Sequence, residues 1–245
     1  LARLETMGVN TAFLTRVAEP TASSVALVQA SGARTFLHRP GASRVAFQNG
    51  GPHFDGPLVQ GASHYHLANV FALPHLRNRA PAVLAAARTA GLTTSLDTAW
   101  DARGEWMQVL APCLPHLDLL FVNEDEARML TGSSDPGVSG PAFFSLGLRG
   151  ALVLKLGAAG CAILNAAGDR EDVPGFAVKV LDTTGAGDCF AGGFLAALTR
   201  GYSLREAARV ANAVGALVVE QTGATTGLRS WPETLAWMER HRPAS

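Results

Sequence analysis

Short apolar runs alternate with alanine-rich segments of helical character along most of the chain, from about residue 56 onward. The apolar runs predict strands at residues 63–70, 93–97, 117–122, 151–156 and 160–164. The segments around them predict helices at residues 81–89, 124–130, 186–199 and 204–220. Several of these strands are apolar at consecutive positions, which is what a sheet buried on both faces requires. The alternation therefore predicts an α/β fold with a doubly wound, mostly parallel sheet and helices on both faces.

The ends of several helices carry sequence signals. Ser203 with Glu206, and Ser230 with Glu233, have the spacing of capping boxes, in which each side chain bonds the backbone N–H of the other residue. Pro232 falls in the first turn after Ser230, where a missing N–H costs no helical hydrogen bond. Three glycines stand where a helix end favours a positive φ: Gly91, Gly132 and Gly201.

The first fifty residues have a different pattern. Residues 11–17, 23–29 and 34–38 predict short strands, and a turn at residues 30–33 joins the last two. No helix signal falls between residues 11 and 49. We expect a small antiparallel sheet that is either an edge decoration or a lid. In this division of the chain, residues 11–50 form the small β lid, and residues 1–10 and 51–245 form the α/β core.

Charge and cysteine content exclude several classes of protein. The chain has 20 Lys and Arg against 20 Asp and Glu, with no basic run, so nothing favours nucleic acid or an anionic membrane as a partner. The longest stretch without a charged side chain, residues 56–76, contains three histidines and two prolines and does not suit a membrane span. No signal-peptide pattern opens the sequence. Three separated cysteines without a C-x-x-C pair fit reduced thiols and a cytoplasmic location: Cys113, Cys161 and Cys189.

Residues 182–194, DTTGAGDCFAGGF, carry the strongest chemical signal. A predicted strand at residues 176–181 leads into a glycine-rich turn and then into a helix. This order directs the free backbone N–H groups of the helix start at an anion. Gly185 and Gly187 lack side chains, so a phosphate can approach these amides closely, and the helix dipole adds a positive potential.

Asp188 follows this turn and has two interpretations. A carboxylate at a helix start is often only a cap for the amides of the first turn. If an anion occupies those amides, Asp188 can instead face a substrate hydroxyl, which is the arrangement for phosphoryl transfer. The sequence contains no G-x-x-x-x-G-K-[ST], G-x-G-x-x-G, G-x-S-x-G or H-E-x-x-H motif. A Walker-type phosphate loop is therefore excluded.

The same residues 182–194 resemble the C-terminal signature of the ribokinase-like (PfkB) carbohydrate and nucleoside kinases, and the resemblance extends over nearly the whole chain. Further segments resemble other parts of that family. Its lid strands are matched by residues 8–10, 20–21 and 32–35, and its N-x-x-E motif by residues 123–127. The strand and turn before the nucleotide are matched by residues 155–160, and the adenine-side segment by residues 211–213 and 221–224.

The resemblance implies roles for the glycine-rich turn and for the N-x-x-E motif. Asp188 would be the general base that accepts the proton of a sugar hydroxyl, and the loose transition state asks for little proton removal until late. An anion hole for the transferring phosphoryl group would comprise Gly185, Ala186 and Gly187. Asn123 and Glu126 would help to hold Mg²⁺ and the nucleotide phosphates through water. Without the resemblance, this last pair is a capping box.

It also implies a nucleotide site for ATP. Gly157 and Gly160 would let the backbone approach ATP and Lys155 would reach its phosphates; the alternative for this stretch is a β-turn that ends a strand. Asn212 would neighbour the adenine; the alternative is a polar residue on the solvated face of its helix. Asp182 and Thr184 match the place where related enzymes bind an activating monovalent cation such as K⁺, together with backbone carbonyls near Val218, Gln221 and Gly223.

Parts of the sequence depart from the family pattern. Asp97 and Trp106 fall where the family often has D-x-N-x-R, but the usual Asn is absent here. We interpret His64 and His66, which alternate along a predicted strand, as packed or edge histidines. The family usually begins with a strand, an acidic sugar-binding position and a Gly-Gly signature. Residues 1–10 match a point well inside that pattern. We therefore expect either that the natural chain is longer than this sequence, or that this product is impaired or completed by another chain.

The sequence therefore supports the hypothesis of an ATP-dependent phosphotransferase that phosphorylates a hydroxyl of a small sugar or sugar derivative. It would use ATP and Mg²⁺, with K⁺ as a candidate activator. The free edges of the lid strands predict pairing between two copies in a homodimer. One alternative is a nucleoside kinase of the same fold, and another is a non-catalytic protein that binds a nucleotide or a sugar. An oxidoreductase on a similar sheet is disfavoured, because the dinucleotide fingerprint is absent.

Overall fold

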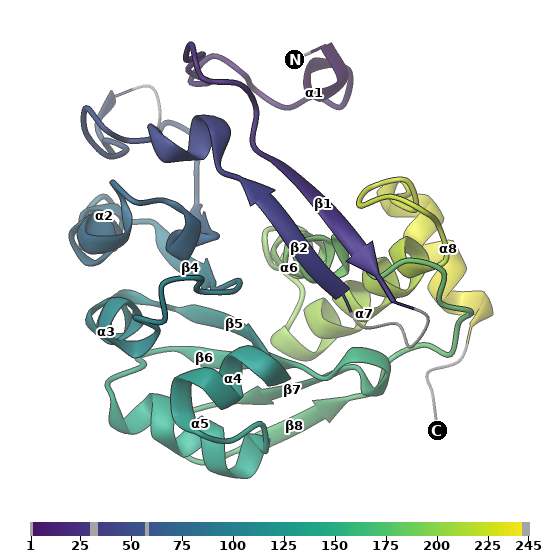
Figure 1. Ribbon diagram of the computed structural model, residues 1–245. Coiled ribbons are helices and arrows are strands. Elements are labelled where there is room, and N and C mark those ends of the chain that lie inside the picture. Colours follow the sequence, from purple (N-terminus) through teal and green to yellow (C-terminus); the bar gives the residue numbers. More distant parts are fainter. Residues whose placement is uncertain (1, 30–33, 57–58, 242–245) are drawn as a thin grey trace.

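The computed structural model describes residues 2–29, 34–56 and 59–241 of the chain, and the described part contains a hairpin and a larger sheet (Figure 1). The antiparallel hairpin pairs β1 (Ser23–Val28) with β2 (Arg34–Arg39). The larger sheet follows chain order, with β3 to β6 parallel and β7 and β8 antiparallel. Its six strands are β3 (His64–Ala68), β4 (Thr93–Asp97), β5 (Leu119–Asn123), β6 (Ala151–Lys155), β7 (Cys161–Leu164) and β8 (Arg170–Val173).

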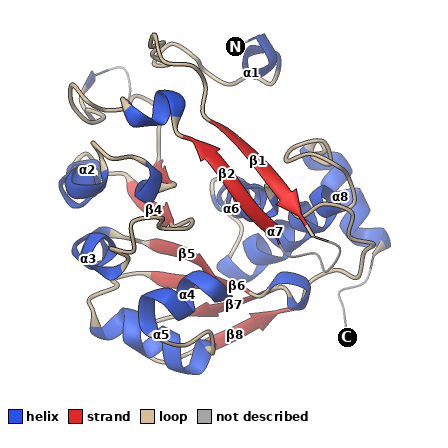
Figure 2. Cartoon of the chain, in the orientation of Figure 1, coloured by secondary structure: helices blue, strands red, loops and turns tan. Residues whose placement is uncertain are grey.

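Helices cover both faces of the larger sheet (Figure 2). One face packs against α2 (Ala80–Thr89), α3 (Met107–Leu110), α4 (Glu124–Thr131) and α5 (Pro136–Ser145). The other face packs against α6 (Ala186–Leu198) and α7 (Leu204–Val219), and α8 (Trp231–Arg240) lies against α7. A short helix, α1 (Ala2–Thr6), opens the chain. No helix in the described part of the chain is long and apolar enough to cross a membrane.

Strand β5 shows why the apolar runs predicted this architecture. Leu120 and Val122 belong to the core on the α2–α5 face, whereas Leu119 and Phe121 belong to the core on the α6–α7 face. Consecutive apolar residues are needed because successive side chains of a strand point to opposite faces, and both faces are covered here. The predicted α/β fold, with a mostly parallel sheet wound on both sides and a small antiparallel sheet, is confirmed.

The predicted helix ends are also confirmed. The Glu206 carboxylate accepts a hydrogen bond from the backbone N–H of Ser203, and Glu233 does the same for Ser230. Both pairs complete a capping box, which satisfies amides that the first turn of a helix leaves unpaired. The glycines predicted at helix ends all have positive φ, namely Gly91 (85°), Gly132 (84°) and Gly201 (83°).

Two predicted strands are wrong. Residues 11–17 form turns and irregular backbone, and residues 176–181 form no strand beyond a single bridge at Phe176. In the second case, the backbone N–H groups of Leu181 and Asp182 both donate to the carbonyl oxygen of Val219 at the end of α7. The segment is therefore held by a helix end and not by a neighbouring strand. The predicted turn at residues 30–33 lies outside the described residues.

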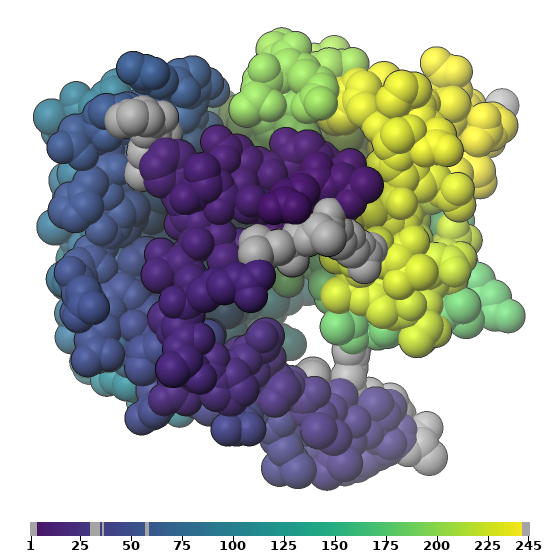
Figure 3. Space-filling view, turned by 90° about the horizontal axis from the view of Figure 1, so that it is seen from above, coloured from purple at the N-terminus to yellow at the C-terminus, as the bar shows by residue number. Residues whose placement is uncertain are grey.

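The hairpin presents an apolar face to solvent. In its register Val25 lies opposite Leu37, Leu27 lies two residues further along the same face, and all three side chains are exposed. Seen from above, the N-terminal residues (purple) lie between the blue segments on the left and the yellow C-terminal residues on the right (Figure 3). The division of the chain into residues 11–50 and a core stays a prediction.

Candidate active site

Three neighbouring parallel strands end in polar side chains. Asp97 ends β4, Asn123 ends β5 and Lys155 ends β6. The carboxyl ends of parallel strands share one edge of a sheet, and this edge is where open α/β sheets bind ligands. Asn123 and Lys155 are direct partners in the ladder. The chain therefore gathers an acid, an amide and a cation at the ligand-binding edge.

Lys155 and Asp97 form a buried ion pair. The Lys155 Nζ lies 2.8 Å and 2.9 Å from the two carboxylate oxygens of Asp97, and both side chains are largely shielded from solvent. Burial raises the pKa of Asp97 above its ordinary value, and the Lys155 charge and hydrogen bonds oppose that rise. The sequence predicts that Lys155 lies near phosphates, but it does not show that Asp97 is its partner, because Asp97 and Lys155 are 58 positions apart.

The glycine-rich turn brings the start of α6 to the same place. Gly185 precedes the helix with a left-handed φ of 75°, and a Cβ there would lie 2.6 Å from the carbonyl oxygen of Ala224. A Cβ on Gly187 would instead lie 3.4 Å from the Nζ of Lys155. Gly185 is thus required for the shape of the turn, and Gly187 keeps the space beside the lysine open.

The amides at this helix start are largely unbonded. The N–H of Ala186 donates to the carbonyl oxygen of Thr183 at 3.3 Å. Within the described ranges, the N–H groups of Gly187 and Asp188 have no acceptor, as expected for the first turn of a helix. The Asp188 side chain is exposed, and its carboxylate makes no hydrogen bond to any described residue. Asp188 therefore does not cap these amides, and both remain available to a ligand.

The two glycines lead to opposite expectations for alanine variants. Gly185→Ala should lower the melting temperature by several degrees, because the new Cβ meets backbone and the φ is unfavourable for alanine. Gly187→Ala should fold normally but bind phosphate less well, because its Cβ reaches the flexible end of Lys155 and narrows the space in front of the free amides. Thermal unfolding and titration with inorganic phosphate test both variants, and a Gly187→Ala protein that binds phosphate as well as the parent chain would contradict the assignment.

The turn is anchored to a distant loop by Asp182. Its Oδ1 accepts hydrogen bonds from the N–H (2.9 Å) and the hydroxyl (2.6 Å) of Thr184, and its Oδ2 accepts one from the N–H of Gly223 (3.0 Å). The side chains proposed for a monovalent cation are thus engaged in bonds within the protein. A K⁺ site here stays a prediction.

A cavity of about 430 Å³ lies beside the start of α6, between the turn after β6 and the helices α6 and α7. Its lining is mostly apolar and includes Lys155, Gly157, Gly160, Phe176, Gly187 and Asn212. Gly157 has open space where a Cβ would lie, whereas a Cβ on Gly160 would collide with the carbonyl oxygen of Val173. The volume and the apolar walls suit a planar base, and the cavity opens toward the free amides.

Asn212 lies in the wall of this cavity and not on the solvated face of α7. Its side-chain NH₂ donates to the carbonyl oxygens of Val173 (3.0 Å) and Pro174 (3.1 Å), and the residue is buried. Asn212 therefore ties the end of β8 to α7. Both of its amide donors are used within the protein, so only its side-chain carbonyl oxygen is left to accept a hydrogen bond from a bound base.

Asn123 and Glu126 form the capping box of α4. The Asn123 side chain accepts from the N–H of Glu126, and the Glu126 carboxylate accepts from the N–H of Asn123, each at 2.9 Å. The same Glu126 oxygen accepts a 2.7 Å hydrogen bond from the hydroxyl of Thr98, next to Asp97. The described residues contain no group of three or more His, Cys, Asp or Glu side chains able to hold a metal. One fixed carboxylate fits Mg²⁺ that is held through water and substrate phosphates.

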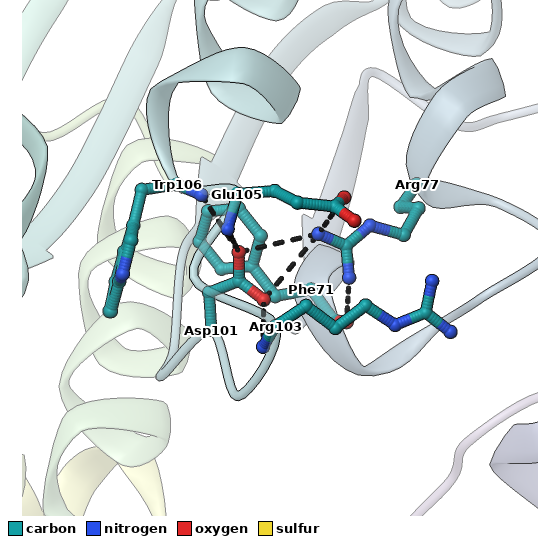
Figure 4. A network of polar contacts seen from close by, with 6 residues as sticks. All are labelled: Phe71, Arg77, Asp101, Arg103, Glu105 and Trp106. Atoms are coloured by element: carbon teal, nitrogen blue, oxygen red, sulfur yellow. Dashed lines mark hydrogen bonds and ion pairs between the residues drawn. The ribbon is translucent and has the colours of Figure 1, made fainter.

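The loop that follows Asp97 is held by a buried arginine (Figure 4). The Arg77 guanidinium donates to the carbonyl oxygen of Phe71 (3.1 Å) and pairs with Asp101 (3.3 Å) and Glu105 (2.6 Å). Burial alone would raise the pKa of Asp101, but backbone N–H donors and Arg77 hold it below its ordinary value. Those donors belong to Arg103, Trp106 and Glu105. This network, which the sequence analysis missed, fixes the loop beside the ion pair.

His64 and His66 lie on β3 and share hydrogen bonds with β4. Burial lowers the pKa of both imidazoles to about 4. The charge of His66 also lowers the pKa of His64, and the charge of Asp118 opposes this effect. The charge of Lys155 likewise lowers the pKa of His66, and the charge of Asp188 opposes that effect. The folded protein therefore resists protonating them, whereas an unfolded chain would protonate both near pH 6.5.

These shifts predict a loss of stability in weak acid. Between about pH 6.5 and 4 the unfolded chain binds more protons, so the free energy of unfolding falls as the pH drops through this window and is constant above it. Urea unfolding at pH 7.5 and at pH 5 measures the loss. The double variant His64→Gln with His66→Gln should lose less between these pH values, and an equal loss would contradict this origin.

Comparison with known proteins now identifies the family. A profile described as pfkB family carbohydrate kinase matches residues 1–231. Mouse (Mus musculus) ribokinase is 41% identical over 128 residues, which is 46% of this chain and 40% of that enzyme, so the chain spans about two fifths of that relative. An uncharacterized sugar kinase of Archaeoglobus fulgidus is 29% identical over 231 residues, 93% of this chain and 88% of the relative.

Solved structures agree in fold. Ribokinase of Thermotoga maritima matches with a TM-score of 0.78 and 24% identity, over 97% of this chain and 75% of that chain. The nucleoside kinase of Burkholderia thailandensis, solved in complex with inosine, matches with a TM-score of 0.79 and 20% identity, over 100% of this chain and 77% of that chain. With its profile match and its ribokinase-like fold, the chain belongs to the pfkB family of carbohydrate kinases.

Proposed function

We propose that the protein transfers a phosphoryl group from ATP to a hydroxyl of a small sugar or sugar derivative, with Asp188 as the general base. The observation that carries this is the start of α6, where an exposed and unbonded carboxylate adjoins two unbonded amides. A base next to the nucleophile and amides next to the migrating charge are what phosphoryl transfer requires. Asp188 would accept the hydroxyl proton as the new O–P bond forms.

The donor would lie in the 430 Å³ cavity, with its base against the apolar wall near Phe176 and its phosphates directed at Gly187. Lys155, which lines the cavity and approaches Gly187, would contact the phosphates. Glu126 and Asn123 would hold Mg²⁺ through water, and this ion would neutralise phosphate charge. Because the N–H of Ala186 is bonded to Thr183, the anion hole expected at Gly185, Ala186 and Gly187 would instead use the free amides of Gly187 and Asp188, with Gly185 setting their orientation.

The hairpin β1–β2 suits the role of a lid. A small sheet with an exposed apolar face can close over a bound acceptor and exclude water, which would otherwise hydrolyse ATP. The same face, with Val25, Leu27 and Leu37, is the surface we propose for pairing with a second copy of the chain. Either use would cover apolar side chains that are exposed in the single chain.

A nucleoside kinase is the second candidate function. The similarity in fold to a nucleoside kinase solved with inosine favours it, since a ribosyl hydroxyl could face Asp188 in the same way. A non-catalytic binding protein is disfavoured, because it could use the open amides to bind a phosphate but would not need an unbonded carboxylate beside them.

An acceptor panel separates these functions. The purified chain would be incubated with ATP, Mg²⁺ and, one at a time, ribose, fructose, adenosine and inosine, and ADP formation would be followed. Sugar-dependent ADP formation supports a sugar kinase, and nucleoside-dependent ADP formation supports the second candidate. If ATP binds but no acceptor stimulates ADP formation, the proposed activity is wrong and the binding function remains.

A further inference from the structure

Four polar side chains form a continuous hydrogen-bonded chain across β3 and β4. The Thr93 hydroxyl lies 2.8 Å from His64 Nδ1, and His64 Nε2 lies 2.7 Å from the Ser95 hydroxyl oxygen. The same oxygen lies 2.6 Å from His66 Nδ1, and Ser95 is fully buried. The ring of His66 is therefore fixed through Nδ1 and also packs edge-on against Phe121.

The other ring nitrogen of His66 is unused. Among the residues that the structure describes, His66 Nε2 has no hydrogen-bond partner, although the side chain is half-buried. A neutral imidazole has one donor and one acceptor nitrogen, and the bond at Nδ1 decides which role is left to Nε2. The Ser95 hydroxyl can donate to Nδ1 or accept from it. His66 Nε2 can consequently either donate to a ligand hydroxyl or accept from one.

The strand register places His66 on the same sheet face as Asp97. His66 on β3 pairs with Ser95 on β4, and Asp97 lies two residues after Ser95 on the same strand. The side chains of His66 and Asp97 are therefore diagonal neighbours on the face that α6 covers. The charge of Lys155 lowers the pKa of His66 and the charge of Asp188 raises it, so both groups act electrostatically on this imidazole. His66 therefore borders the charged centre of the site, which comprises Asp97, Lys155 and Asp188.

His66 lies on the side of this centre away from the nucleotide cavity. Lys155 lines that cavity while its Nζ is bonded to Asp97, and neither Asp97 nor His66 is part of the cavity wall. If the donor fills the cavity, the acceptor must reach Asp188 from the opposite side, where β4 and β3 end. The free nitrogen of His66 is a described polar group on that side with no role in holding the fold.

We propose that His66 binds the acceptor through a hydrogen bond between its Nε2 and an acceptor hydroxyl, and that Ser95 and His64 are positioning residues that fix its ring. The inference rests on the proposed kinase function, because it assumes that the acceptor is a polyhydroxyl compound placed against Asp188. It adds to that function a residue that selects for hydroxyl-rich acceptors.

The test compares three variants with the parent chain, using whichever acceptor of the panel (ribose, fructose, adenosine or inosine) is phosphorylated. His66→Phe keeps an aromatic ring against Phe121 but removes Nε2, whereas His66→Gln keeps a polar group near the position of Nε2. Ser95→Ala releases the ring. The exposed His75 provides a matched control, His75→Ala.

His66→Phe should raise the KM for the acceptor about tenfold, the loss of roughly one hydrogen bond, while the KM for ATP changes less than twofold. His66→Gln should recover part of this loss, and Ser95→Ala should show an intermediate increase. His75→Ala should match the parent chain. Calorimetric titration of the acceptor without ATP should rank the dissociation constants of the variants in the same order as their KM values. A purely structural role of the histidine would not produce this agreement.

An unchanged acceptor KM and dissociation constant in His66→Phe would overturn the inference and leave the kinase function standing. If His66→Phe does not fold, the same comparison is made on His66→Gln and Ser95→Ala, where unchanged constants in both variants overturn it. If the parent chain binds no compound of the panel, the proposed function fails and the inference fails with it.

Discussion

Asp188→Asn should reduce phosphoryl transfer by about a thousandfold, within the range expected for loss of a general base. Asparagine has nearly the same shape as aspartate, but its amide cannot accept the hydroxyl proton. The variant should bind ADP with unchanged affinity in calorimetric titration, because the open amides and the cavity wall remain. Its melting temperature should also be unchanged, since the carboxylate is exposed and forms no hydrogen bond within the described chain.

A matched control lies at the start of another helix. Asp125 occupies the first turn of α4, is exposed, and pairs with Arg128 on the same helix. Asp125→Asn should retain full activity, because surface ion pairs of this kind contribute little. Full activity of Asp188→Asn would show that another group accepts the proton, and the assignment of the site would then have to be abandoned.

Lys155→Met should affect both stability and activity. Removal of the ammonium group leaves the Asp97 carboxyl group buried without its partner, and we expect the free energy of unfolding to fall by about 3 kcal/mol. Activity should fall by about a hundredfold, because a cation beside the anion hole stabilises the charge of the transferring phosphoryl group. Urea unfolding and steady-state kinetics measure the two effects separately.

The double variant Asp97→Asn with Lys155→Met distinguishes the two effects. Asparagine carries no charge, so it removes the buried carboxylate that Lys155→Met leaves unpaired, and more than half of the lost stability should return. Activity should stay low, because the double variant still lacks the lysine. If Lys155→Met unfolds at the same urea concentration as the parent chain, the ion pair is not the stabilising contact that its geometry indicates.

Local patterns predicted the elements of the core, because each pattern depends on residues close in sequence. Strand β4 was predicted at its observed bounds, and the box of Ser203 and Glu206 placed the start of α7 correctly. A strand also needs a neighbouring strand, which the pattern does not show. Residues 176–181 have strand-like composition, but the N–H of Leu181 at the end of this segment donates to the carbonyl oxygen of Val219 in α7. Strand β8 was missed for the converse reason, since Arg170–Val173 is mostly charged and lies at a sheet edge.

For the site, the sequence predicted which segments meet but not which side chains pair. The glycine-rich turn is visible because its residues are contiguous, and its geometry follows from glycine chemistry. The partners of Lys155 and of Arg77 are invisible in the sequence, because they depend on which strands and loops become neighbours in space. The free Nε2 of His66 is equally hidden, since it depends on the bond that Ser95 makes with the other ring nitrogen.

The order of strands in the larger sheet has a consequence for how the protein is made. From β4 to β8 each strand pairs with the one synthesised just before it, so the sheet can grow by addition at one edge as the chain emerges from the ribosome. Helix α6, which carries Asp188, follows only after the sixth strand of this sheet. We therefore expect a nascent chain that has all six strands of the sheet but is chemically inert until α6 has been translated.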